Sequence, residues 1–351
     1  MKILFAGGGT MGSVSPLIAV YEKIKDKKAK AEFLFLGTKT GPEKEAVASY
    51  KIPYRAISSG KLRRYFDRAN FSDIFKIFWG FIQSFFILLS FRPKAMMVAG
   101  SFVGVPVAWA ARILFIPVLI HQQDIVAGLA NKLMANAARK ITVSFEPSLR
   151  DFSSRKTILT GNPVRQEFFS CEPKKDRQIL GLKKDLPVVL IFGGGTGATK
   201  INETVEKSLA ELLTFCQVIH LTGKGKNTSD QRDNYYQFEF LTDEMMSALC
   251  VADLVVSRAG MSTLSELAIL GKPSIIIPIP GHQDANAMHF QKNGAAFMLS
   301  QEILNSDNLI ARIKELIFDK TKREALSQNI VRVMKRDGAD KVAKILIGMA
   351  K

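Results

Sequence analysis

Residues 3–12 are ILFAGGGTMG and residues 188–198 are VVLIFGGGTGA. In each stretch, an apolar run of strand-forming residues leads into a glycine cluster, and a helical pattern begins directly after it. A strand, a glycine-rich turn and a helix in succession are typical of the first unit of a doubly wound parallel sheet. Because the pattern occurs twice, the sequence predicts two α/β domains in tandem.

The rest of the chain alternates short apolar runs with helical patterns. Continuously apolar strands separated by helices predict parallel sheets with both faces covered. The candidate strands are 2–6, 32–36, 54–57, 95–98, 117–121, 141–145 and 157–159 in a first series, and 188–192, 218–221, 238–240, 254–256, 274–278 and 296–299 in a second. We place the boundary near residues 162–165, which gives domains over 1–163 and 164–337. A terminal helix over 338–351 could pack on either domain.

The composition is that of an ordinary globular protein. Of the 351 residues, 47% are hydrophobic and 23% are charged, which allows a sizeable core. These fractions exclude a mainly disordered, collagen-like or disulfide-scaffold protein. The net charge of +17 predicts attraction to polyanions: nucleic acid, an acidic membrane surface or phosphorylated substrates.

Cysteine usage and the N-terminus indicate a reducing compartment. Cys171, Cys216 and Cys250 are scattered and contain no CxxC pair, so we expect reduced thiols and no structural zinc. The apolar run after Met1 is too short for a signal peptide, and glycines stand where the cleavage region would be. We therefore expect the chain to begin with a β-strand.

The two glycine clusters predict anion sites. A glycine-rich turn between a strand and a helix directs several backbone N–H groups and the positive end of a helix dipole at one place. Residues 7–12 and 193–197 both fit, although either could be only a tight turn. Neither has the GxGxxG and downstream acidic residue of a nicotinamide site, nor the GK[ST] of a P-loop. Two facing domains that each carry such a turn, at the carboxyl end of the sheet, would bind a diphosphate-bearing ligand. This favours a nucleotide-sugar enzyme over a dehydrogenase.

Two polar segments follow in the second series. Residues 257–271, SRAGMSTLSELAILG, place Ser262, Thr263 and Glu266 at the start of a helix. They fit either a capping box or a ligand site in which Glu266 accepts hydrogen bonds from both ribose hydroxyls. Residues 278–287, PIPGHQDANA, collect four polar side chains in an apolar neighbourhood. This segment fits either a ligand loop or a polar turn.

Residues 61–86 combine a basic cluster with an aromatic helical pattern. The basic residues are Lys61, Arg63, Arg64 and Arg68, and they precede IFKIFWGFIQSFFILLSF, residues 74–91. On a helix, one apolar face would contain Ile74, Phe78, Phe81, Ile82, Phe85 and Leu89, with Lys76 and Gln83 off it. This pattern is typical of a segment that lies in a membrane interface. Part of the face would instead be buried core, and a spanning helix would split a parallel-sheet domain.

Nucleic acid is the rival explanation of the positive charge. The sequence has no basic strand interleaved with aromatic residues and no recognition helix. We therefore expect an anionic membrane surface and a phosphorylated substrate as partners, and no nucleic acid.

Seven motifs, taken together, resemble those of the MurG family. They are GGGTMGSVSP, HQQDIVAGLANK, GNPVR, GGGTGATKIN, HLTGKG, SRAGMSTLSE and HQDANA, in family order from Gly7 to Ala287. MurG enzymes are GT-B glycosyltransferases that move N-acetylglucosamine (GlcNAc) from UDP-GlcNAc to lipid I, undecaprenyl-pyrophosphoryl-MurNAc-peptide. The product is lipid II, used in peptidoglycan synthesis.

The resemblance implies an architecture and a location. It implies two Rossmann-like domains that face a cleft, the first for the acceptor and membrane and the second for UDP-GlcNAc. It also implies that the helix over 338–351 packs back on the first domain. The reaction would be an inverting transfer that forms a β-1,4 bond, without a cofactor. The enzyme would lie peripherally on the cytoplasmic face of the inner membrane.

The resemblance also implies site residues. On the acceptor side these are Thr10, Met11, Gly12 and Ser13 at the first glycine turn, with Asp124 and Asn131. Arg165 matches an arginine that contacts the donor diphosphate. On the donor side they are Gly195 or Thr196 at a phosphate, Asn202 in the cleft, Leu241 at uracil, Gln283 at the sugar, and Met261, Ser262, Thr263, Leu264, Ser265 and Glu266 at the phosphates and ribose.

The chain departs from the family pattern on the acceptor side. The family's GGTGGH is GGTMGS here, so Ser13 replaces a histidine. The family's HEQN is HQQD, with Gln122 for glutamate and Asp124 for asparagine, and a Gly-Gly-Tyr element is residues 100–102, GSF. These departures leave open a different lipid acceptor, a catalytically silent UDP-sugar-binding protein or a UDP-sugar epimerase.

The transfer needs a base for the acceptor hydroxyl, and Ser13 cannot serve near neutral pH. Asp124 is the predicted base, with Asn131 beside it as the second catalytic residue; alternatively, Asp124 only caps a helix that begins at Val126. We interpret His121 and His220 as hydrogen-bonded structural histidines. No DxD pair follows a predicted strand, so we expect no metal ligand; helix dipoles and arginine would hold the diphosphate.

Overall fold

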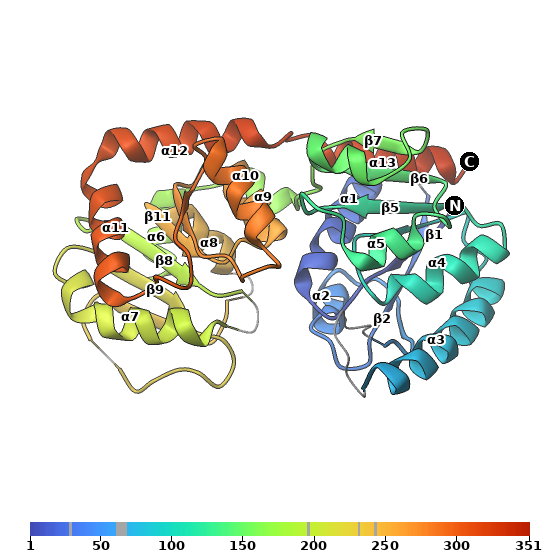
Figure 1. Ribbon diagram of the computed structural model, residues 1–351, viewed down its shortest axis with the longest axis horizontal. Helices are drawn as coiled ribbons and strands as arrows, with labels where there is room; N and C mark the ends of the chain where they lie inside the picture. Colours follow the sequence, from blue (N-terminus) through green and yellow to red (C-terminus); the bar gives the residue numbers. More distant parts are fainter. Residues whose placement is uncertain (28–29, 61–68, 195–196, 231, 242–243) are drawn as a thin grey trace. The chain divides into compact units, whose positions relative to one another are not determined.

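The computed structural model describes residues 1–27, 30–60, 69–194, 197–230, 232–241 and 244–351. The chain divides into two compact units (Figure 1). Unit 1 is Met1–Arg165 with Lys335–Lys351, and unit 2 is Gln166–Met334. The units meet at 165/166 and 334/335, within three residues of the boundaries expected at 163/164 and 337/338.

Unit 1 contains a seven-stranded parallel sheet in the order β3-β2-β1-β4-β5-β6-β7. Its strands are β1 (Lys2–Ala6), β2 (Glu32–Gly37), β3 (Tyr54–Ala56), β4 (Ala95–Val98), β5 (Val118–Gln122), β6 (Lys140–Val143) and β7 (Thr157–Leu159). The strand order reverses at β1, which pairs with both β2 and β4. The glycine turn after β1 therefore lies at the switch point of the sheet, where doubly wound folds bind ligands.

Helices cover both faces of this sheet. They are α1 (Ser15–Asp26), α2 (Glu43–Ser49), α3 (Ala69–Phe91), α4 (Gly104–Ile113), α5 (Leu129–Met134) and α13 (Gly338–Met349), with the short 3-10 helices η1 (Met11–Ser13) and η2 (Glu146–Asp151). Alternate residues of β1 enter two separate cores, Ile3 and Phe5 on one face and Leu4 and Ala6 on the other. The terminal helix α13 packs on α1 and β4.

Unit 2 repeats this plan with six parallel strands in the order β10-β9-β8-β11-β12-β13. The strands are β8 (Val188–Phe192), β9 (Gln217–Leu221), β10 (Tyr235–Phe238), β11 (Leu254–Ser257), β12 (Ser274–Ile276) and β13 (Phe297–Met298). The helices are η3 (Gln166–Phe169), α6 (Pro173–Ile179), α7 (Thr199–Leu212), α8 (Glu244–Val251), α9 (Met261–Leu270), α10 (Asp284–Lys292), α11 (Ser306–Phe318) and α12 (Lys320–Val333). Here β8 is central, and its glycine turn leads into α7.

Twelve of the thirteen predicted strands agree with the structure to within two residues at either end. The prediction of a strand over 238–240 is wrong in its position. The strand is β10, in which Tyr235 is buried and pairs with Val218. Phe240 lies beyond the end of β10, and its side chain is exposed.

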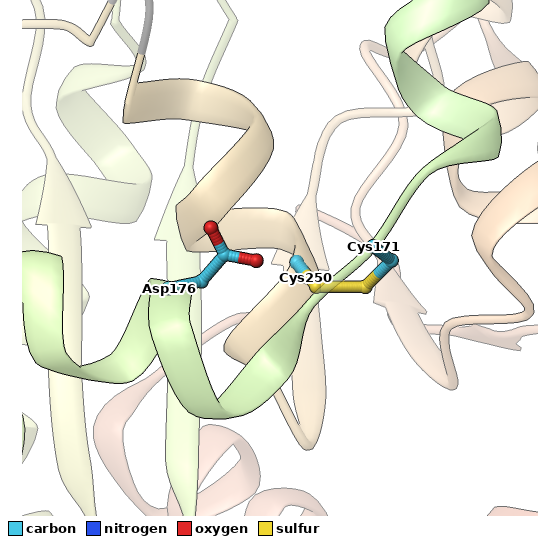
Figure 2. A group of neighbouring side chains, drawn as sticks. All are labelled: Cys171, Asp176 and Cys250. Carbon is cyan, nitrogen blue, oxygen red and sulfur yellow. A yellow bond between two sulfur atoms is a disulfide. The ribbon is translucent and has the colours of Figure 1, made fainter.

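The expectation of reduced, unpaired cysteines is also wrong. Cys171, which follows η3, and Cys250 in α8 form a disulfide with a Cα–Cα distance of 5.7 Å (Figure 2). They lie 79 residues apart in sequence, so no local motif announces the pairing. Cys216 is a buried free thiol, and burial raises its pKa to about 12.

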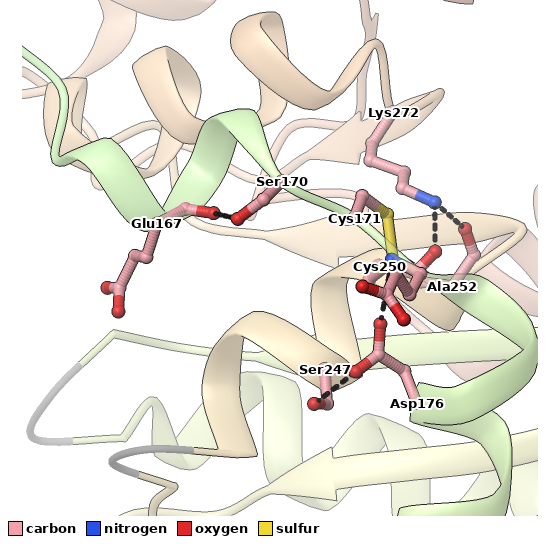
Figure 3. Close-up of a disulfide and its surroundings, with 9 residues drawn as sticks. Glu167, Ser170, Cys171, Asp176, Ser247, Cys250, Ala252 and Lys272 are labelled. Carbon is pink, nitrogen blue, oxygen red and sulfur yellow. Dashed lines mark hydrogen bonds between the residues drawn. A yellow bond between two sulfur atoms is a disulfide. The ribbon is translucent and has the colours of Figure 1, made fainter.

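The surroundings of the disulfide are polar (Figure 3). The ammonium of Lys272 donates to the carbonyls of Cys250 and Ala252 at 2.6 and 2.9 Å. It thereby satisfies the end of α8, where carbonyls lack helical partners. A carboxylate oxygen of Asp176 and both sulfurs lie within 4.8 Å of one another, but sulfurs bonded to each other cannot also bind a metal as thiolates.

Candidate active site

The first glycine turn follows β1 at the switch point. Gly9 has φ of +83°, in the left-handed region that favours glycine. A Cβ at this position would lie 2.6 Å from the ring of Phe102. The close approach and the backbone conformation together explain the glycine.

Ser13 is buried and holds the turn together. Its hydroxyl accepts from the Gly8 amide at 3.3 Å and lies within donating distance of the Gly8 and Thr10 carbonyls, at 3.3 and 3.2 Å. Thr10 is exposed, and Met11 and Gly12 are half-buried. The hydroxyl of Ser13 thus makes its hydrogen bonds within the turn, whereas Thr10, Met11 and Gly12 remain accessible at the carboxyl end of the sheet.

Two neighbouring loops are tied to this turn. Ser101, after β4, donates to the Gly8 carbonyl at 3.0 Å. Gln123, after β5, donates from Nε2 to the carbonyls of Gly12 and Ala99 at 2.9 and 3.1 Å. Sequence reasoning noted residue 101 only as a departure from the family and assigned no role to Gln123. The contacts join segments distant in sequence, so no local signal could have found them.

Asp124 lies in the loop between β5 and α5. Gln122 is buried and donates from Nε2 to the backbone oxygens of Asp124 and Val126 at 2.8 and 3.1 Å. Its Oε1 accepts from Asn131 Nδ2 at 2.7 Å. The two buried amides therefore shape the loop that carries the half-buried Asp124.

The alternative role for Asp124, as the cap of a helix beginning at Val126, is wrong. The helix that follows, α5, begins at Leu129, and its N-cap is Gly128. No side chain caps it.

His121 and His220 are both buried and hydrogen-bonded within the fold. His121 donates from Nε2 to Asn162 at 2.8 Å and accepts at Nδ1 from the Thr142 hydroxyl at 2.9 Å. His220 makes the same type of contacts with Asn202 at 3.2 Å and with the Tyr235 hydroxyl at 2.9 Å. Burial lowers the pKa of each imidazole to about 4, so both are neutral at pH 7.

In unit 2, α9 begins at the carboxyl end of β11. Its N-cap is Gly260, which is extended, and no side chain caps the helix. The capping-box interpretation of Ser262, Thr263 and Glu266 is therefore wrong. A ten-residue helix without a side-chain cap presents its first amides and its positive dipole end, which favour an anion.

The predicted donor residues of α9 differ in accessibility. The side chains of Ser262, Thr263 and Glu266 are half-buried at the helix surface. Those of Met261, Leu264 and Ser265 are buried, and Ser265 donates to the Met261 carbonyl at 2.6 Å. Only the first group is placed for side-chain contact with a ligand, whereas Met261 offers its backbone.

The loops after β11 and β12 are joined by side chains. Gln283 Oε1 accepts from the amides of Ala259 and Ile279, both at 3.1 Å, which leaves its Nε2 group to donate. Arg258 donates to the carbonyls of Ile277 and Pro278, both at 3.1 Å. Sequence analysis gave Arg258 no function, and the structure makes it a brace for the segment before Gln283.

The remaining predicted residues fall on both units. Asn202 donates to the Thr222 carbonyl at 2.8 Å and accepts from His220, so its amide supports the fold of unit 2. Leu241 is half-buried after β10, and Arg165 is the half-buried last residue of the first segment of unit 1. Gly195 and Thr196 lie outside the described residues.

The predicted aromatic helix exists as α3, and by length and composition Asp73–Phe91 could cross a membrane. A narrow stripe of α3 is buried: Asp73, Gly80, Ser84 and Leu88. The exposed apolar side chains are Ile74, Phe75, Phe78, Trp79, Phe86 and Leu89. Of the predicted apolar face, Phe81 and Phe85 pack on the core, which agrees with the expectation that part of this face is buried. The cluster Lys61, Arg63, Arg64 and Arg68 lies outside the described residues.

Contacts along α3 fix it to unit 1. Gln83 Oε1 accepts from the Ser58 amide at 2.7 Å. A Cβ at Gly80 would lie 2.0 Å from the Ser58 carbonyl, so the helix approaches this segment closely. The neighbouring helix α4 packs against α3 (Figure 1) and exposes Trp109 and Ile113, with Phe115 just beyond its end.

Comparison with known proteins identifies the family. Residues 3–143 match the N-terminal domain model of glycosyltransferase family 28, and residues 188–342 match its C-terminal domain model. A *Clostridium kluyveri* protein is 40% identical over 326 residues, covering 91% of this chain and 92% of its own. It is named UDP-N-acetylglucosamine--N-acetylmuramyl-(pentapeptide) pyrophosphoryl-undecaprenol N-acetylglucosamine transferase. The chain belongs to the MurG family.

A further relative has the same name, and solved structures share the fold. The *Lachnospira eligens* protein of the same name is 37% identical and covers 98% of this chain and 97% of its own. The crystal structure of *Acinetobacter baumannii* MurG superposes with a TM-score of 0.74 over 99% of both chains, at 23% identity. A UDP-GlcNAc 2-epimerase from *Neisseria meningitidis* reaches 0.68 over 99% of both chains, at 15% identity. The likeness to these two structures shows the fold, which is GT-B as the sequence predicts.

Proposed function

We propose that this MurG-family chain is an inverting glycosyltransferase that moves GlcNAc from UDP-GlcNAc to lipid I and so forms lipid II for peptidoglycan. The observation that carries the proposal is near-full-length similarity to relatives named for this transfer. The site geometry is compatible with it, since each unit presents backbone amides at a helix or glycine turn. We propose unit 1 for the acceptor and unit 2 for the donor.

On the donor side, the first turn of α9 holds the diphosphate. Its uncapped amides supply the donors, and the hydroxyls of Ser262 and Thr263 add to them. Glu266, one turn further along, accepts from the ribose hydroxyls. Gln283 donates from Nε2 to the sugar, and the backbone of Leu241 contacts uracil. Gly195 or Thr196 contributes to a phosphate.

On the acceptor side, Thr10, Met11 and Gly12 contact the acceptor, whereas Arg165 binds the diphosphate of the donor. Arginine suits this role because its planar fork makes paired hydrogen bonds to phosphate oxygens. Asp124 takes the proton of the attacking acceptor hydroxyl, while UDP leaves from the anomeric carbon. Asn131 acts through Gln122, which positions the Asp124 loop.

The exposed aromatic surface of α3 and the end of α4 rests on the anionic cytoplasmic face of the inner membrane. Phe75, Phe78 and Phe115 insert their rings among the headgroups, and the excess positive charge attracts the anionic lipids. Peripheral docking suits this helix better than spanning, because spanning would break the contacts of Gly80 and Gln83 with Ser58.

The proposal is tested by transfer of labelled GlcNAc from UDP to a lipid I analogue. Diacylglycerol acceptors, UDP-glucose and UDP-galactose are offered in parallel, and one arm contains EDTA. We expect product with lipid I and UDP-GlcNAc, including in EDTA. Transfer only to diacylglycerol would indicate a different lipid acceptor. Donor binding without turnover would indicate a silent binding protein, and a 2-epimer formed without acceptor would indicate an epimerase.

A further inference from the structure

Glu43 is a fully buried carboxylate that the proposed reaction does not use. It is the first residue of α2, and no part of its side chain reaches solvent. Burial of a carboxylate is unfavourable unless hydrogen bonds compensate for the lost hydration. The contacts of Glu43 therefore indicate why the residue is there.

The carboxylate joins the loops that follow two adjacent strands. Its Oε2 accepts from the amide of Gly9, after β1, at 3.1 Å. Its Oε1 accepts from the amide of Thr38, after β2, at 2.7 Å, and from the Thr38 hydroxyl. A Cβ on Gly8 would lie 2.4 Å from Oε1, so the carboxylate packs directly against the glycine turn.

These contacts fix one peptide plane. The peptide between Gly8 and Gly9 consists of the Gly8 carbonyl and the Gly9 amide. Glu43 accepts from the amide, and the hydroxyl of Ser101 donates to the carbonyl at 3.0 Å. Between two glycines a peptide rotates easily, because neither residue has a Cβ to restrict its backbone. Held at both ends, this peptide has one orientation, which sets where Thr10 and the following residues lie.

We propose that Glu43 is a positioning residue for the acceptor side of the reaction. It acts by fixing the Gly8–Gly9 peptide, and thus the accessible residues Thr10, Met11 and Gly12. This inference rests on the proposed function, because the acceptor is what those residues would contact.

The test is Glu43→Gln, which preserves size. One side-chain oxygen is replaced by an NH2 group, which cannot accept a hydrogen bond. The remaining oxygen cannot accept from both loops at once, so Gly9 or Thr38 loses its partner. We expect kcat/KM for the lipid I analogue to fall by about tenfold or more, the usual effect of losing a hydrogen bond to a charged group. The Kd for UDP, measured by calorimetry, should not change, because the contacts of Glu43 given above involve no predicted donor residue.

Tyr54→Phe is the matched control. The Tyr54 hydroxyl donates to the Thr38 carbonyl at 2.5 Å and lies 3.5 Å from Oε1 of Glu43. The amide of Gly9 bonds the other oxygen, Oε2, so Tyr54→Phe leaves the contact with the Gly8–Gly9 peptide in place. We expect a lower melting temperature with unchanged kcat/KM for the acceptor. Ser101→Ala removes the shorter of the two hydroxyl contacts with the Gly8 carbonyl, the other being that of Ser13. Its effect on kcat/KM should combine less than additively with that of Glu43→Gln.

An unchanged acceptor kcat/KM in Glu43→Gln overturns the proposal, as does an equal weakening of UDP binding, which would indicate general damage. If Glu43→Gln does not fold, Ser101→Ala alone decides: a normal acceptor kcat/KM overturns the proposal, and a selective loss supports it. Failure of the proposed function is recognised separately, because the wild-type chain would then transfer no GlcNAc to lipid I.

Discussion

Ser13 and Asp124 lie in the two loops that we propose for the acceptor side, and their surroundings differ. The hydroxyl of Ser13 is engaged with Gly8 and Thr10, so it supports the turn and offers no base. Asp124 lies half-buried in a loop shaped by Gln122, and it caps no helix. We propose Asp124, on a loop that the buried amides of Gln122 and Asn131 hold in place, as the group that takes the proton of the acceptor hydroxyl.

Asp124→Asn tests this role. The amide keeps the size of the side chain but cannot take up a proton, so kcat for transfer to the lipid I analogue should fall by about a hundredfold or more. The KM for UDP-GlcNAc should be little changed. Steady-state kinetics over a range of pH would measure both, and the ionisation that limits kcat at low pH should disappear.

Asp151→Asn is a matched control for that variant. Asp151 accepts from the amide of Ala127, in the same loop, at 2.7 Å. Its loss should reduce stability and leave the shape of the pH profile intact. Turnover of Asp124→Asn within a few-fold of the wild type would exclude Asp124 as the base.

At the scale of elements, α3 has two opposed faces. Its buried stripe consists of small or polar side chains and Leu88, which allow close packing on unit 1. Its outer face carries large aromatic side chains, with Phe75 75% and Phe78 62% exposed. Apolar surface of this kind on a folded protein marks an interaction site.

Phe75→Asp combined with Phe78→Asp tests the membrane surface. Two carboxylates on this face should weaken sedimentation with phosphatidylglycerol vesicles by about tenfold or more, because they remove apolar contact and add repulsion by anionic lipid. Activity on a short-chain, water-soluble acceptor should stay near the wild-type value.

The control is Phe318→Asp, which alters a phenylalanine of unit 2 that is 70% exposed. This variant should bind vesicles normally. Equal loss of binding in both variants, or unchanged binding of the α3 variant, would contradict the assignment of the surface to α3.

The disulfide joins the segment after η3 to α8. Closing a loop across 79 residues of sequence should stabilise unit 2 by about 4 kcal/mol in the chain-entropy model. Dithiothreitol or Cys171→Ser should therefore lower the melting temperature measured by calorimetry. Cys216→Ser should still respond to dithiothreitol as the wild type does. Three free thiols in the native, unreduced protein would show that the bond does not form.

At the scale of the whole molecule, each unit contains one buried neutral histidine. An unfolded chain protonates histidine below about pH 6.5, whereas burial lowers the pKa of His121 and His220 to about 4. Between these values the unfolded chain holds more protons, so the free energy of unfolding falls as the pH falls. Above pH 6.5 the two histidines contribute no pH dependence.

Urea denaturation at pH 7 and pH 5 would measure this loss. The full shift corresponds to about 3 kcal/mol for each histidine, reached only near pH 4. His220→Gln, which does not titrate, should be less stable than the wild type at pH 7 and should lose less on acidification. An equal loss in both proteins would indicate that other groups cause the pH dependence.

The sequence predicted the sheets well because their strands are buried on both faces and therefore continuously apolar. Prediction failed for a strand that is not fully buried. Residues 236–238 of β10 are only half-buried, and the sequence placed this strand at 238–240, beyond its true position. The glycine turns were found from the succession of an apolar run, a glycine cluster and a helical pattern. The capping interpretations of Asp124 and of Ser262 failed because the start of a helix depends on the backbone of the preceding loop, as at Gly128 and Gly260.

By itself, the sequence determined two parallel-sheet domains, the positions of their glycine turns and the MurG family. The domains and turns follow from local patterns, since strand, turn and helix preferences act over a few neighbouring residues. The family was indicated by the resemblance of seven motifs taken together. Only the tertiary structure decided that Cys171 pairs with Cys250, that Ser13 and Asn202 brace the fold, and that Glu43 holds Gly9. Each of these contacts depends on which strands and helices become neighbours, because folding brings together groups that the chain keeps apart.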